Sequence, residues 1–145
     1  MEAPIEEIAI PATAPELGAL YAALDRFWAV IDATLPEPPG RAWRDQFATA
    51  VVEIAGNIIR HAYRNRKPGL MRLRLWAYPN WLEARFEDHG VVCVLPPTAE
   101  DESDPLALAE SGRGLRIVRA YLDRLDYRRT AEGANEWRLE KRLRG

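Results

Sequence analysis

Residues 52–62 read VEIAGNIIRHA, and this stretch is the most informative part of the sequence. It lies in a longer segment, from about Trp43 to Tyr63, in which apolar residues recur every three or four positions. Such a repeat is typical of an amphipathic helix that buries one side. The apolar residues on the shared stripe are Phe47, Val51, Ile54 and Ile58. We therefore predict a mostly buried helix over this segment.

A narrow polar strip follows the same predicted helix. At about 100° per residue, the side chains that gather on it are Gln46, Glu53, Asn57 and Arg60. Glu53 and Asn57 are four positions apart, so both side chains project from one face, about 6 Å apart. A carboxylate can take a proton from a hydroxyl nucleophile, and an amide oxygen can bind a hard cation such as Mg²⁺. The structural alternative is that Glu53 pairs with an arginine such as Arg60 and Asn57 hydrogen-bonds backbone.

Two elements are predicted upstream of this helix. Ile5, Ile8 and Ile10 lie in a short stretch that fits a β-strand. A second amphipathic repeat, from Leu17 to Ile31, predicts a helix that ends before the proline-rich loop at residues 36–40.

The residues downstream of the helix alternate with a period of two. Leu70 to Tyr78 and Trp81 to Glu87 each place apolar and polar residues in turn, and Pro79-Asn80 supplies the connection. The two segments therefore predict a hairpin. The elements expected after it are a helix that begins just after Gly114 and two strands within residues 125–143.

Helices and hairpins in this mixed order, rather than regular βαβ alternation, favour an α+β fold. We expect a two-layer sandwich in which a mostly antiparallel mixed sheet is covered on one face by helices. A chain of 145 residues with 48% hydrophobic residues suits a single domain over residues 1–145. Residues 95–111 are rich in proline and acidic side chains and lack a regular period, so we expect a loop there.

Composition narrows the function classes. A formal net charge of −2 disfavours general binding to nucleic acid or to an anionic membrane surface. Cys93 is the only cysteine, so neither an intramolecular disulfide nor a cysteine-based zinc set can form. No apolar stretch approaches the roughly 20 residues that cross a bilayer, and the N-terminus lacks a signal-peptide pattern. We expect a cytoplasmic protein without a direct nucleic-acid or membrane partner.

Two short glycine-containing motifs stand at predicted element boundaries. Asp88-His89-Gly90 directly follows a predicted strand, where a glycine lets backbone approach a flat ligand and the carboxylate can accept from an exocyclic amine. Gly112-Arg113-Gly114 opens a predicted helix, whose unpaired N–H groups favour an anion. The alternatives are an ordinary strand-ending turn and an ordinary helix entry. Neither a Walker motif nor a strand-linked GxGxxG is present, which removes the main support for P-loop and Rossmann folds.

In their order along the chain, these motifs resemble those of a known family. Residues 52–62 look like the N box of the GHKL (Bergerat-fold) ATPases, in the form found in the anti-sigma-factor serine kinases or anti-sigma regulatory factors. Residues 88–90 resemble the first half of the G1 box, residues 112–115 the G2 box, and residues 136–141 the final strand. The resemblance covers nearly the whole chain and implies the Bergerat, or histidine-kinase-like ATPase, fold.

The resemblance also implies residue roles. Glu53 would be the catalytic base acting on a target serine, Asn57 would help to hold Mg²⁺, and Asp88 would bind the adenine amine. The loop at residues 95–111 would be the lid over ATP. The implied nucleotide-binding positions are Asn57, His61, Asp88, Gly90, Gly112, Arg113, Gly114 and Leu115. His61 lies one helical turn beyond Asn57, and its alternative role is packing or capping.

For the whole protein, the resemblance implies an ATP- and Mg²⁺-dependent protein-serine kinase. It would phosphorylate an antagonist (anti-anti-sigma) protein and sequester a sigma factor, and so regulate transcription in a stress response; a homodimer is common in the family. The sequence departs from the family where Val92 replaces the usual second G1 glycine and Asn135 replaces a frequent threonine. Two alternatives remain: a partner-switching binding module with weak or no nucleotide binding and no kinase activity, and an activator of a partner phosphatase or cyclase.

Overall fold

The computed structural model describes residues 2–64, 66–93 and 113–143. The lid loop expected at residues 95–111 lies outside the described residues. The elements, in chain order, are β1 (Glu6–Pro11), the 3₁₀ turn η1 (Ala14–Glu16), α1 (Leu17–Thr34), α2 (Arg41–His61), β2 (Leu70–Ala77), β3 (Trp81–Asp88), α4 (Arg113–Tyr121), β4 (Arg124–Arg129) and β5 (Asn135–Arg142). Each predicted strand and helix has its counterpart among them, with bounds shifted by a few residues at most.

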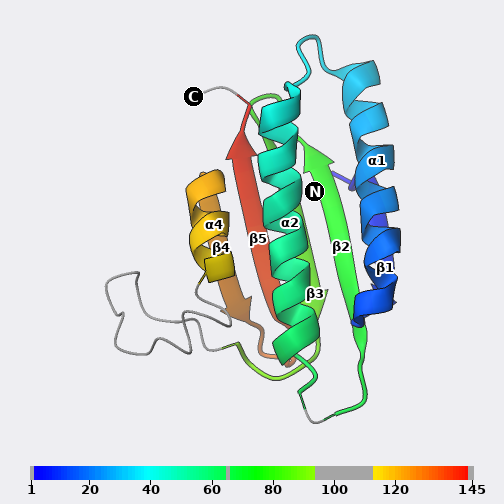
Figure 1. Cartoon of the computed structure of the whole chain (residues 1–145), viewed down its shortest axis with the longest axis vertical. Coiled ribbons are helices and arrows are strands. Elements are labelled where there is room, and N and C mark those ends of the chain that lie inside the picture. The colour runs from blue at the N-terminus through cyan, green and yellow to red at the C-terminus, as the bar shows by residue number, and fades with distance from the viewer. Residues whose placement is uncertain (1, 65, 94–112, 144–145) are drawn as a thin grey trace.

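The five strands form one sheet in the order β1-β2-β3-β5-β4. All four strand pairings are antiparallel, so the expected α+β sandwich is confirmed and the described strands contain no parallel pair. Figure 1 shows α1, α2 and α4 lying on the same side of this sheet. No described helix is both long and apolar enough to cross a membrane.

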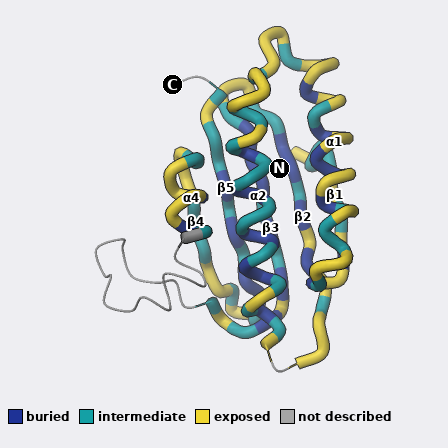
Figure 2. Tube along the Cα trace, viewed as in Figure 1, coloured by how far each residue is buried: buried dark blue, intermediate teal, exposed yellow. Residues whose placement is uncertain are grey.

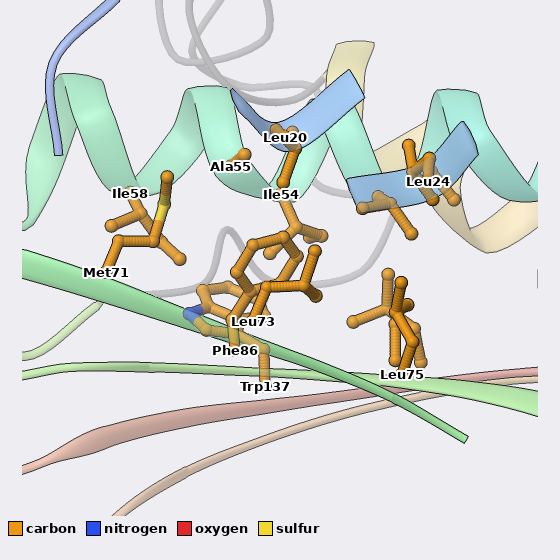
Figure 3. Packing of buried hydrophobic residues seen from close by; sticks show 14 of the residues in the cluster. Leu20, Leu24, Ile54, Ala55, Ile58, Met71, Leu73, Leu75, Phe86 and Trp137 are labelled. Carbon is orange, nitrogen blue, oxygen red and sulfur yellow. The ribbon is translucent and has the colours of Figure 1, made fainter. Parts of the chain in front are cut away.

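The core lies between the helices and the side of the sheet that faces them, as the band of buried positions along α2 and the strands shows in Figure 2. The predicted apolar stripe of α2 is confirmed, because its four residues are at most 2% exposed. The alternating residues of the strands meet this stripe (Figure 3): Leu73 and Leu75 from β2, Phe86 from β3 and Trp137 from β5. Each fully buried side chain of this size contributes about 1.5–3 kcal/mol to folding.

α1 packs beside α2 through aromatic and aliphatic side chains. Phe27 and Phe47 stack with ring centroids 6.4 Å apart, and Leu20 and Ile31 are fully buried in the same cluster. α1 ends at Thr34, two residues before Pro36, because the residue that precedes a proline is biased away from helical geometry.

Two contacts fix the positions of the segments that carry the motifs. The Val91 amide donates to the carbonyl of Ala62, 2.6 Å away, and so ties the chain that follows β3 to the end of α2. On α4, Leu115 and Val118 are buried in the common core, so this short helix lies beside α2. The second half of α2, the end of β3 and the start of α4 are therefore neighbours.

Candidate functional site

The polar strip of α2 runs from half-buried Gln46 to exposed Arg60, and Asn57 is its one buried residue. Asn57 is only 5% exposed, whereas Glu53 is half-buried. Within the described residues, neither side chain forms a hydrogen bond or an ion pair, so the alternative pairing of Glu53 with Arg60 does not occur. The polar atoms of the Asn57 side chain are not among the fully buried side-chain atoms without a partner, so they still reach the surface. Both groups therefore keep bonding capacity for a ligand.

The carboxylate of Glu53 lies against the start of α4. A Cβ atom placed on Gly114 would come within 2.6 Å of Glu53 Oε2, so a side chain at this position would have to displace the carboxylate. Two motifs that are 61 positions apart in sequence thus meet in space. Gly112 lies outside the described residues, and only the backbone of Arg113 is described. The side chain of Leu115 is 3% exposed and anchors α4 in the core.

Asp88 ends β3, and its side chain is 1% exposed. Its Oδ1 accepts a hydrogen bond from the Gly90 amide at 2.8 Å and another from Asn135 Nδ2 at 2.8 Å. Burial raises the pKa of the Asp88 carboxyl above its usual value, while these two hydrogen bonds work in the opposite direction. The same oxygen takes both bonds, so Oδ2 keeps its acceptor capacity with respect to the described residues.

Asn135 connects Asp88 to the neighbouring backbone and to β4. Its Nδ2 also donates to the carbonyl of Val91 at 2.9 Å. Its Oδ1 accepts from the hydroxyl of Tyr127 and from Arg129 Nη1, the latter at 3.1 Å. Donor and acceptor atoms of the amide are thus both occupied by protein, which fixes the Asp88 carboxylate and the chain that follows it.

Sequence reasoning did not identify Tyr127 and Arg129 as members of this site. The Tyr127 hydroxyl accepts from the Cys93 amide at 2.8 Å, and Arg129 Nη1 donates to the carbonyl of Gly90 at 2.7 Å. A signal existed, because the alternation of β4 places both residues on the face that carries Leu125. The alternation did not show, however, which residues of the neighbouring strand these two side chains would meet.

Gly90 is required by a close approach of backbone to backbone. A Cβ atom there would lie 2.0 Å from the carbonyl oxygen of Ala62, at the end of α2. Val92 behaves differently, since it is 53% exposed. Its side chain is therefore not packed into the core, and the departure from the family pattern at this position leaves the hydrogen bonds of Asp88 intact.

His61 is the last residue of α2, one turn beyond Asn57. Its Nδ1 lies 2.6 Å from Arg64 Nη2, and because a guanidinium can only donate, Nδ1 is the acceptor in this pair. The imidazole is thereby oriented by its own chain segment.

The arrangement has two chemically distinct ends. One end offers the buried Asp88 carboxylate, which suits an amine donor on a flat ligand. The other offers the start of a helix with Glu53 and Asn57, which suits an anion and its cation. Among the described residues, no group of three His, Cys, Asp or Glu side chains could hold a metal ion. A Mg²⁺ ion here would fit as one that takes the Asn57 amide oxygen as a ligand and completes its shell from elsewhere.

Comparisons with known proteins agree with the fold. Among solved structures, the histidine kinase AdeS of Acinetobacter baumannii is similar with a TM-score of 0.52 and 13% sequence identity, over 100% of this chain and 70% of that one. At this identity the likeness concerns the fold. No curated protein matches the chain. Residues 14–141 match the family described as the histidine kinase-like ATPase domain. This match confirms the resemblance to the GHKL ATPases, and the chain belongs to the histidine kinase-like ATPase domain family.

Proposed function

We propose that this domain binds ATP with Mg²⁺ and acts as a protein-serine kinase of the anti-sigma-factor type. It would phosphorylate an antagonist protein and hold a sigma factor in the absence of that antagonist. The observation that carries the proposal is the position of Glu53: its carboxylate lies against Gly114 at the start of α4 and is not neutralised by any described cation. The choice of partners rests on the resemblance of the N box.

The nucleotide would lie between the two ends of the site. Asp88 Oδ2 accepts from the exocyclic amine of adenine, while Asn135 holds Oδ1. The phosphates lie toward the backbone that opens α4, where N–H groups and the helix dipole favour negative charge. Val92 is 53% exposed and so does not close off a buried cavity beside Asp88, which supports nucleotide binding.

The chemistry asked of the protein is positioning and one proton transfer. Glu53 takes the hydroxyl proton of the target serine as the bond from its Oγ to the γ-phosphorus forms. The bond between that phosphorus and the bridging oxygen breaks, and ADP leaves with the electron pair. Bound Mg²⁺ would neutralise charge on the phosphate oxygens, and Asn57 would supply one of its ligands.

The test separates binding from transfer. Calorimetric titration with ATP and ADP, with and without Mg²⁺, is run on the wild type, Glu53→Gln and Asp88→Asn. Transfer from γ-labelled ATP is then followed to an antagonist-type domain from the same genome. Glu53→Gln should bind ATP within about threefold of the wild type yet lose at least about 100-fold in transfer, the usual contribution of a general base. Asp88→Asn should lose ATP binding. The Gly90 amide and Asn135 hold the oxygen of the new side chain, so its nitrogen faces the adenine amine and cannot accept a hydrogen bond.

Asp45→Asn is the matched control, since it makes the same kind of charge change at an exposed position of α2. It should leave both measurements unchanged. Equal loss of binding and transfer in Glu53→Gln would contradict the role of Glu53 as a base. No detectable binding at millimolar nucleotide would overturn the kinase proposal and leave a nucleotide-independent binding module.

A further inference from the structure

The hydroxyl of Tyr63 lies between two strands at the point where their pairing ends. Tyr63 is half-buried and follows the last residue of α2 by two positions. Its hydroxyl donates to the carbonyl of Leu70 at 2.9 Å and accepts from the amide of His89 at 3.0 Å. One hydroxyl therefore connects the chain that leaves α2 with the start of β2 and the end of β3, which lie at the same end of the sheet (Figure 1).

This hydroxyl takes the place of a direct hydrogen bond between β2 and β3. In an antiparallel pair of strands, hydrogen-bonded residue pairs recur at every second position. The Tyr78 amide donates to the Trp81 carbonyl, which fixes this series at the hairpin turn. Followed along the register, the series reaches Leu70 and His89, one position beyond the last registered pair. Tyr63 is inserted between the His89 amide and the Leu70 carbonyl, so the strands part where β3 ends.

The ring of Tyr63 is held in this position by its packing. A Cβ atom placed on Gly69 would lie 2.6 Å from Cε1 and Cζ of Tyr63 and 2.7 Å from the hydroxyl oxygen. The ring thus lies directly against the backbone of Gly69, whose carbonyl accepts from the Ala12 amide at 2.9 Å. Burial raises the pKa of the Tyr63 hydroxyl above its usual value, so the proton donated to Leu70 stays in place at neutral pH.

Tyr63 acts on the peptide that joins Asp88 to His89. The Asp88 side chain is fixed by its two hydrogen bonds, but its direction also depends on its own backbone. The N–H of the joining peptide has the Tyr63 hydroxyl as its acceptor. Tyr63 in turn follows α2, which carries Glu53 and Asn57. This contact therefore relates the carboxylate at one end of the candidate site to the polar strip at the other end.

We propose that Tyr63 is a positioning residue for base recognition: by holding the His89 amide, it keeps Asp88 Oδ2 directed at the exocyclic amine of adenine. The inference rests on the proposed nucleotide binding and adds a residue that lies outside the three motifs. A role of Tyr63 in stability alone predicts a different result. It would weaken the binding of every nucleotide alike, whereas a role in base recognition affects only a nucleotide that carries the amine.

The test uses the full chain and two probes, ATP and purine riboside triphosphate, which is ATP without the 6-amino group. Both are titrated calorimetrically with Mg²⁺ into the wild type and into Tyr63→Phe, which keeps the ring and loses only the hydroxyl. Tyr21→Phe is the matched control, because Tyr21 is 52% exposed on α1 and its hydroxyl forms no hydrogen bond to a described residue. Thermal unfolding of each protein checks that the variants are folded.

Tyr63→Phe should weaken ATP binding about fivefold, the effect of one lost hydrogen bond, and should change the affinity for the purine analogue less than about twofold. Tyr21→Phe should change neither affinity. Equal weakening of the two nucleotides, or unchanged ATP binding in Tyr63→Phe, would overturn the inference and leave the proposed nucleotide binding in place. Absence of ATP binding in the wild type would overturn the proposed function and this inference with it.

Discussion

The two ends of the candidate site are built differently. At one end, Asp88 is held by the Gly90 amide and by Asn135, which is itself fixed by Tyr127 and Arg129. At the other end, Glu53 and Asn57 form no hydrogen bond to a described residue, although Asn57 is buried.

The difference suits what each end would have to do. A group that recognises a rigid, uncharged base gains from being fixed in advance, because no ordering cost is then incurred on binding. Groups that act on phosphate and a hydroxyl must form their bonds with ligands whose charge changes during transfer. The free hydrogen-bonding atoms of Glu53 and Asn57 fit this second role. The fully hydrogen-bonded amide of Asn135 fits the first role, recognition of a rigid base.

The largest expected effect comes from breaking the fixed end at Gly90. In Gly90→Ala the new methyl group collides with the Ala62 carbonyl, since the ideal Cβ position is 2.0 Å from that oxygen. We expect a loss of about 3 kcal/mol in the free energy of unfolding, measured in urea, because neither backbone can move easily. Gly18→Ala is the control: nothing lies within 4 Å of its Cβ position, and it should gain up to about 1 kcal/mol from helix propensity. Equal stability of the two variants would show that the contact at Gly90 is not rigid.

Removing the amide of Asn135 should have a smaller effect. Asn135→Ala removes one of the two hydrogen bonds to Asp88 Oδ1 and the acceptor of the Tyr127 hydroxyl, so we expect a loss of about 2 kcal/mol in urea unfolding and weaker ATP binding. Tyr127→Phe removes one donor to Asn135 and the acceptor of the half-buried Cys93 amide, and it should cost about 1 kcal/mol. If the tyrosine variant proved the more damaging, the network would not be centred on Asn135.

The smallest expected effect concerns the charge of Asp88. Because burial raises its pKa, the folded state holds this proton more tightly than the unfolded state. The wild type should therefore lose stability as the pH rises from the usual value of 3.8 through the raised pKa, and it should stay lower at neutral pH. Asp88→Asn has no such proton to lose, so its stability relative to the wild type should increase over that window. Urea unfolding of both proteins at several pH values tests this, and a relative decrease in the variant would contradict it.

Local patterns in the sequence were sufficient to predict the helices and strands and the side of each that is buried. The stripe of α2 and the alternation of β2 and β3 depend on residues a few positions apart, where helical and strand periodicities act directly. Glu53 and Gly114 were selected as candidate site residues from the order of three motifs and their family resemblance, whereas their contact in space was not predicted. Asp88 was identified in the same way.

The hydrogen bonds of Asn135 could not be predicted from such local patterns. Its bonds to Asp88 and Val91 span 47 and 44 positions, so they depend on the register of β5 against β3. The requirement for glycine at position 90 depends on the contact with the carbonyl of Ala62 at the end of α2. The register that places Arg74 opposite Arg85, and Arg85 opposite Arg138, could not be predicted either, because alternation predicts which side of a strand a residue faces but not its neighbour on the next strand.

The order of the strands leaves β1 and β4 at the two margins of the sheet. β4 carries charged side chains on most of its six positions, and β1 ends in Pro11, which has no N–H to donate. Such margins discourage the addition of a strand from another molecule, and they protect the protein against open-ended aggregation.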